Sequence, residues 1–148
     1  MKQMEIERSQ YQNAGLMRRL GALLYDAALL FSILLLATAL ATFLNGGSAP
    51  PNSAMRIWLV FVTVVFFGGF WRNGGQTLGM RAWRLTLFST RGEQLRWRDI
   101  VLRLLVASLS IACVGAGYWW ALIDAQRRTW HDIASSTVLK HLPPTPKT

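Results

Sequence analysis

Three long apolar runs, separated by charged or turn-forming positions, dominate this chain of 148 residues. The first covers residues 20–44, in which Asp26 is the only charged residue. The second covers residues 57–71, between Arg56 and Arg72. About 20 helical residues cross the hydrocarbon core of a bilayer. The first run therefore predicts a membrane-spanning helix, and the second predicts another once flanking residues are added and the two arginines snorkel.

The third apolar run, residues 104–123, has no charge and is interrupted by Gly115 and Gly117. Twenty residues are too few for two crossings, so this run forms either one spanning helix or a re-entrant segment bent near the glycines. Three crossings would place the basic C-terminal tail on the outer side, whereas its charges favour the inner side. We favour three transmembrane helices and leave open the side on which the tail lies.

The loop over residues 72–99 has the strongest charge asymmetry in the chain, with six arginines against Glu93 and Asp99. By the positive-inside rule this loop is cytoplasmic, and so is the N-terminus. Within it, residues 83–88 favour a strand, followed by a turn and then residues 93–96, which predicts a small hairpin on the membrane surface. The expected fold class is an all-α membrane protein with about three transmembrane helices and this β-hairpin-like loop between the second and third.

Polarity divides the chain into three parts. Residues 1–15 predict a polar N-terminal arm, residues 16–140 the membrane domain, and residues 141–148, with Pro143, Pro144 and Pro146, a disordered tail.

The composition of the chain limits the kinds of molecule that we expect it to bind. Lys and Arg number 16 against 7 Asp and Glu, a formal charge of +9, which in a membrane protein favours contact with anionic lipid headgroups. We expect no nucleic-acid partner, because no RNA-binding signature accompanies the arginines. The single cysteine, Cys113, excludes an intrachain disulfide and a cysteine-based metal site. No nucleophile elbow, phosphate loop or metal motif is present, so we expect neither an enzyme nor a cofactor.

The candidate chemistry lies in a few polar residues next to the apolar runs. Arg19 and Asp26 are seven positions apart and so share one helix face. Asp132, in a Trp-His-Asp sequence, is a candidate partner for Arg19. A carboxylate inside a membrane span usually faces a partner or water, so the site is either a structural polar clamp or an ion or proton site.

Two other polar residues have ordinary interpretations. Arg103 follows Asp99 by four positions, which favours an ion pair within one helix over substrate binding. His131 can exchange protons near neutral pH, but beside a tryptophan and an aspartate it is more simply a hydrogen-bonding surface residue.

Three segments in order resemble the RDD family of small bacterial membrane proteins. Residues 18–26 read Arg-Arg-Leu-Gly-Ala-Leu-Leu-Tyr-Asp, residues 75–81 read Gly-Gln-Thr-Leu-Gly-Met-Arg, and residues 131–138 read His-Asp-Ile-Ala-Ser-Ser-Thr-Val. The resemblance covers about residues 14–140. It implies that the arginine and two aspartates for which the family is named are Arg19, Asp26 and Asp132. The segment containing Gln76, and an arginine opening the third helix, here Arg103, also look like family features.

The resemblance implies a multi-pass protein of the bacterial inner membrane, and some members are associated with transport, including sodium/proton antiport. The first hypothesis is therefore a small transporter or exchanger, in which Asp26 and Asp132 bind a monovalent cation or proton and Arg19 sets their pKa. Three spans offer few surfaces for a pathway, so such a transporter would form a homo-oligomer. The alternative is a non-transporting scaffold or assembly partner, in which Arg19, Asp26 and Asp132 form a structural clamp.

Overall fold

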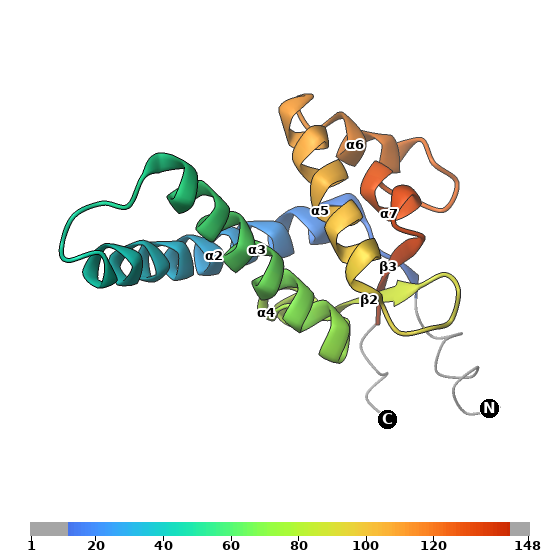
Figure 1. Ribbon diagram of the computed structural model, residues 1–148. Coiled ribbons are helices and arrows are strands. Elements are labelled where there is room, and N and C mark those ends of the chain that lie inside the picture. Colours follow the sequence, from blue (N-terminus) through green and yellow to red (C-terminus); the bar gives the residue numbers. More distant parts are fainter. Residues whose placement is uncertain (1–11, 143–148) are drawn as a thin grey trace.

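The computed structural model describes residues 12–142, and the fold is mostly helical with one small sheet (Figure 1). The elements in chain order are β1 (Gln12–Asn13), α2 (Leu16–Leu44), α3 (Asn52–Gly74), α4 (Leu78–Ala82), β2 (Leu85–Ser89), α5 (Trp97–Ala112), α6 (Ala116–Trp119), the 3-10 helix η1 (Trp120–Leu122), α7 (Trp130–Ala134) and β3 (Thr137–His141). The expected N-terminal arm and C-terminal tail lie largely outside the described residues.

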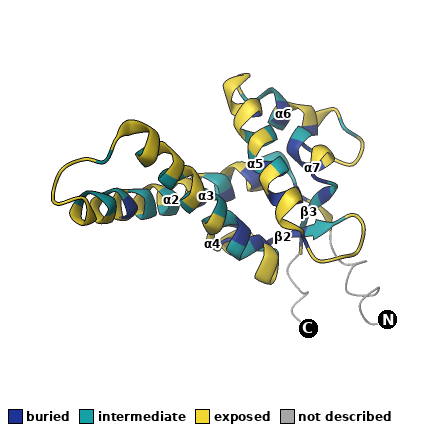
Figure 2. Ribbon diagram, in the orientation of Figure 1, coloured by how far each residue is buried: buried dark blue, intermediate teal, exposed yellow. Residues whose placement is uncertain are grey.

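Helices α2 and α3 are long and apolar enough to cross a membrane, and they form a hairpin (Figure 1). Within the apolar window of each helix only 6% of residues are buried in the protein. Figure 2 shows both helices as mostly exposed or half-buried, with few buried residues. Apolar helices with so little buried surface are typical of helices that face lipid.

The third apolar segment is broken. Helix α5 and the α6–η1 pair meet at an angle of 104°, with Gly115 at a φ of +75° in the break. Residues 12–142 therefore contain two candidate membrane-spanning helices, or three if the bent pair is counted as one span. The bend falls where the sequence places it, because glycine takes this left-handed conformation without steric cost.

The sheet joins three distant segments in the antiparallel order β1-β3-β2. Leu85 pairs with His141 and Ser89 with Thr137, while Gln12 also pairs with His141. The predicted strand within the loop is present, but the predicted hairpin is wrong. The partner of β2 is the C-terminal strand β3, and residues 93–96 form no strand.

The buried core lies next to this sheet and not along the α2–α3 hairpin (Figure 2). Leu85 and Leu87 on β2 and Leu139 on β3 point to the same side, where they pack with Ile100 and Trp71. The core thus ties the membrane helices to the sheet at one end of the molecule.

Two adjacent glycines in α3 test the packing of this helix. A Cβ atom on Gly68 would lie 2.1 Å from the Trp97 ring, whereas one on Gly69 would meet nothing within 4 Å. We expect Gly68→Ala to lower the melting temperature, since the ring must move. Gly69→Ala should leave it unchanged or raise it, because alanine favours helix by up to about 1 kcal/mol. Equal melting temperatures for the two variants would contradict this packing.

Candidate functional site

A buried carboxylate held between two arginines forms the polar centre of the molecule. Asp132 Oδ2 accepts a hydrogen bond from Arg19 Nη1 at 2.5 Å, and Asp132 Oδ1 accepts one from Arg103 Nη1 at 2.5 Å. The side chains are 3% (Arg19), 0% (Asp132) and 7% (Arg103) exposed. We call these three residues the polar cluster. The predicted partnership of Arg19 with Asp132 is present, and Arg103 completes it.

The two arginines extend the polar cluster into the surrounding elements. Arg19 also donates from Nε to the Ala14 carbonyl at 3.1 Å and from Nη2 to the Arg127 carbonyl at 2.8 Å. Arg103 Nη1 donates to Thr137 Oγ1 at 2.7 Å. The cluster therefore connects α2, α5, α7 and the start of β3.

The carboxylate of Asp132 also accepts a hydrogen bond from a nearby backbone N–H group. The Thr129 backbone N–H, at the N-cap of α7, donates to Asp132 Oδ2 at 3.1 Å. Burial by itself raises the pKa of Asp132, but the positive charges of Arg103 and Arg19 together outweigh burial and hold the pKa below its usual range. Asp132 is therefore ionised, and the cluster carries two positive charges against one negative charge.

Asp26 lies in a separate site on α2. Its Oδ2 accepts a hydrogen bond from Thr77 Oγ1, and its Oδ1 accepts one from the Gly79 backbone N–H at 2.9 Å. Thr77 is the N-cap of α4 and also accepts from the Met80 N–H at 3.1 Å. Asp26 thus binds the beginning of α4 to α2.

The expected trio of Arg19, Asp26 and Asp132 is therefore not formed among the described residues. Arg19 and Asp26 share a helix face, but helical side chains point towards the N-terminus of their helix. Arg19 accordingly reaches back to Ala14, Arg127 and Asp132, away from Asp26.

Two further expectations are corrected. Arg103 pairs with Asp132, and Asp99 lies 3.5 Å from Arg91 in a separate ion pair. His131 is only 5% exposed, so it is no surface residue. Its ring lies 5.0 Å from the Tyr118 ring, between centroids, and its Nδ1 has no hydrogen-bond partner among residues 12–142.

Gln76 has a supporting role away from the polar cluster. Its Nε2 donates to the Leu85 carbonyl at 2.8 Å and to Thr86 Oγ1 at 2.7 Å. These bonds join the segment before α4 to strand β2.

The buried His131 predicts a pH dependence of stability. Burial, followed by the charge of Arg103, lowers its pKa from 6.5 to about 3. The unfolded chain takes up this proton near pH 6.5 and the folded chain does so only near pH 3, so the stabilisation is full above pH 6.5 and is lost as the pH falls. We expect stability to decrease between pH 6.5 and pH 4, by up to roughly 1.4 kcal/mol per pH unit from this residue.

Melting curves of His131→Phe at several pH values check this expectation. The stability of this variant should depend less steeply on pH between pH 6.5 and pH 4 than that of wild type. Part of the slope should remain, because burial and the charges of Arg18 and Arg84 also lower the pKa of His141. An unchanged slope in His131→Phe would contradict the assignment.

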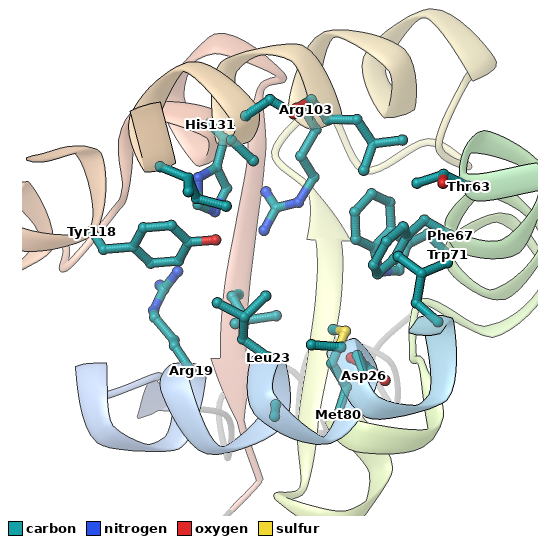
Figure 3. A pocket seen from close by; sticks show the side chains of 18 residues that line it. Arg19, Leu23, Asp26, Thr63, Phe67, Trp71, Met80, Arg103, Tyr118 and His131 are labelled. Carbon is teal, nitrogen blue, oxygen red and sulfur yellow. The ribbon is translucent and has the colours of Figure 1, made fainter. Parts of the chain in front are cut away.

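A cavity of about 340 Å³ lies beside the polar cluster, between α2, α3 and α5 (Figure 3). Arg19, Arg103, Tyr118 and His131 line one side of it, and Asp26 lines another. Most of its wall is apolar, with Leu23 and Phe67 among the residues shown in Figure 3.

Sequence reasoning missed several residues of these sites. They are Thr77, the partner of Asp26; Thr137, a partner of Arg103; and Trp71 and Tyr118 in the cavity wall. Only Thr77 had a usable signal, as a threonine before a short helix in a Gly-Gln-Thr-Leu-Gly segment, which is typical of an N-cap.

The described residues hold no group of three or more His, Cys, Asp or Glu side chains that could bind a metal ion.

Two long apolar helices, a broken third apolar segment and a buried arginine–aspartate cluster define a small helical membrane protein. The RDD family model matches residues 13–136, most of the chain, and this protein belongs to the RDD family. Searches of curated proteins and of solved structures find no significant match.

Proposed function

We propose that this protein is a non-transporting membrane scaffold, in which the polar cluster acts as a structural clamp. This proposal rests on the hydrogen bonding of the Asp132 carboxylate, both of whose oxygens already have arginine donors. Each of its oxygens accepts a 2.5 Å hydrogen bond from an arginine, and its side chain is 0% exposed. A carboxylate with these bonds has little capacity to bind and release a cation, whereas it holds four elements together.

The proposed placement has α2 and α3 as the two crossings and the α5–α6 segment as re-entrant. The sheet supports it, because three full crossings would separate β3 from β1 and β2 by a membrane, yet these strands are paired. The arginines of residues 72–99 would place the sheet side in the cytoplasm of a bacterial cell, at the inner membrane. Arg72, Arg81, Arg84, Arg91, Arg96 and Arg98 would then face anionic headgroups.

In this scaffold the clamp fixes the sheet and the basic loop against the membrane helices. The exposed apolar faces of α2 and α3 would meet lipid or a second copy of the chain. The proposal predicts that loss of the clamp changes folding and assembly first and produces no selective defect in ion flux.

Cation or proton exchange remains the second candidate, because Asp26 lines the cavity. In that reading a proton or monovalent cation reaches Asp26 through the cavity. Each Asp26 oxygen already accepts a hydrogen bond from the α4 end, which favours a structural role for it too.

Proteoliposome flux separates the two candidates. Purified protein is reconstituted with an internal pH-sensitive dye and driven with Na⁺, K⁺ or Li⁺ in turn, using wild type and Asp26→Asn. The scaffold proposal predicts no cation-dependent proton flux above empty liposomes for either protein. Flux in wild type that disappears in a stably folded Asp26→Asn variant would overturn it in favour of exchange.

A further inference from the structure

We propose that the cavity between α2, α3 and α5 binds a single-chain anionic amphiphile, with its carboxylate at Arg103 and its hydrocarbon tail between the three helices. This inference rests on the membrane placement proposed above. It does not depend on how much the clamp contributes to stability.

The cavity has a polar end and an apolar end. Arg19 on α2 and Arg103 on α5 lie on the same side of the cavity as Tyr118 and His131 (Figure 3). Trp71 on α3 lies across from Tyr118, and its ring centre is 5.3 Å from the Arg103 guanidinium carbon. Since α3 runs antiparallel to α2, the wall continues to Leu30, Thr63 and Ile111 at the opposite end. At 1.5 Å per residue, the distance along α2 from Arg19 to Leu30 is about 16 Å. This gradient matches an amphiphile whose head lies at the sheet side, near the membrane surface.

The polar end favours a negative head. Arg19 and Arg103 together exceed the charge of Asp132 by one positive charge, and the low pKa of His131 keeps that ring neutral. Arg103 directs Nη1 to Asp132 and Thr137 but makes no hydrogen bond through Nε or Nη2 among the described residues. A guanidinium has five N–H donors, so three are free for a carboxylate.

Two buried polar atoms of cavity-lining residues also lack partners in the described part of the chain. They are His131 Nδ1 and Trp71 Nε1, in residues that are 5% and 8% exposed. A buried polar group without a hydrogen bond costs about 1–3 kcal/mol. A ligand head with acceptor oxygens would reduce this cost at Trp71, which can only donate.

The Asp26 carboxylate does not lie beside the place proposed for the carboxylate of the ligand. Both its oxygens accept hydrogen bonds from the beginning of α4, at Thr77 and Gly79. In Figure 3 its side chain lies near Met80, apart from the group formed by Arg103, Tyr118 and His131.

The volume of the cavity and its opening fit a single hydrocarbon chain that enters from the bilayer. A cavity of about 340 Å³ holds on the order of ten small groups, each of about the 30 Å³ that a water molecule occupies in the liquid. Ala27 on α2 and Ser108 on α5 line the cavity and are also exposed, so the cavity opens at the face where these helices would meet lipid. Helix α3 packs against both α2 and α5 and closes the other side.

The test uses the full-length protein in phosphatidylcholine nanodiscs and a fatty acid with a photoreactive group on its tail. We expect labelling of cavity-lining segments of α2, α3 and α5. At equal membrane concentration, unlabelled laurate should compete about tenfold better than dodecanol or dodecyltrimethylammonium, a difference of about 1.4 kcal/mol.

Adjacent alanines supply the matched variants. Ala27 lines the cavity and Ala28, its exposed neighbour, does not. Ala27→Phe should fill the opening and reduce labelling at least fivefold, whereas Ala28→Phe should label like wild type. Both variants keep the polar cluster intact, and their melting temperatures report whether they fold.

Each of three labelling results would overturn the inference. They are equal displacement of the label by the three competitors, labelled residues that lie outside the cavity, and labelling of Ala27→Phe like that of wild type. A protein that inserts into the nanodisc but is not labelled would overturn this inference and leave the scaffold proposal standing. A protein that does not insert would contradict both.

Discussion

Replacing Asp132 with asparagine is expected to be among the most damaging single substitutions in this protein. It leaves Arg19 and Arg103 buried without a counter-charge, and breaking a buried ion pair from one side costs about 3–5 kcal/mol. For a chain of this size that loss corresponds to a fall in melting temperature on the order of 10 °C. Thermal unfolding of the purified protein, followed by circular dichroism or tryptophan fluorescence, measures it.

Glu93→Gln is the matched control, because it makes the same acid-to-amide change in an exposed pair. Glu93 Oε2 lies 2.6 Å from Arg96 Nη2, with the two side chains 57% and 66% exposed. Exposed pairs contribute little, so this variant should melt like wild type. If Asp132→Asn also melted like wild type, the clamp would be refuted.

The second large effect is expected at Gly79, in the first turn of α4. A Cβ atom there would lie 2.4 Å from the Ala22 carbonyl oxygen and 2.8 Å from Asp26 Cγ and Oδ1. Since all three contacts are with Ala22 and Asp26 of α2, Gly79→Ala must push α4 away and break the hydrogen bond from its N–H to Asp26. We expect a loss of at least about 2 kcal/mol, as for overpacked sites.

Gly74→Ala is the control for this prediction. A Cβ atom on Gly74, at the end of α3, would meet nothing within 4 Å. The variant should therefore fold and melt like wild type, while Gly79→Ala yields less folded protein with a lower melting temperature. Comparable behaviour of the two variants would show that α4 does not pack closely on α2.

The sequence was most informative about the membrane helices. The length and apolarity of the runs ending near Leu44 and Gly74 are sufficient to predict α2 and α3, because lipid imposes a long, uninterrupted apolar helix. The bend of the third run was also foreseeable, since glycines interrupt it at Gly115 and Gly117. Its membrane role was not, because composition does not distinguish a crossing from a re-entrant segment.

Sequence spacing gave a partial account of the polar residues. The seven-residue interval between Arg19 and Asp26 gives a common face but ignores the direction of the side chains, which separates them in the structure. The four-residue interval between Asp99 and Arg103 was misleading for a different reason. A buried arginine gains more from the fully buried Asp132 than from a partner at the end of its own helix.

The sheet was the least predictable part of the fold. Strands β2 and β3 have five residues each and pair across about fifty positions of sequence. In the structure Thr137, Leu139 and His141 of β3 are buried and the residues between them are half-buried, but the sequence Thr-Val-Leu-Lys-His shows no matching alternation of apolar and polar residues. A local hairpin was therefore the simpler expectation, and long-range pairing prevailed because it buries Leu85, Leu87 and Leu139 together.

A double-mutant cycle on Arg19→Met and Asp132→Asn tests the clamp most directly. Unfolding free energies are measured for wild type, both single variants and the double variant under one condition. The clamp predicts strong coupling: the double variant is less destabilised than the sum of the single variants, by about 1–3 kcal/mol, because removing Asp132 costs less once Arg19 is gone. Additive effects of the two substitutions would show that Arg19 and Asp132 do not stabilise this protein as a pair.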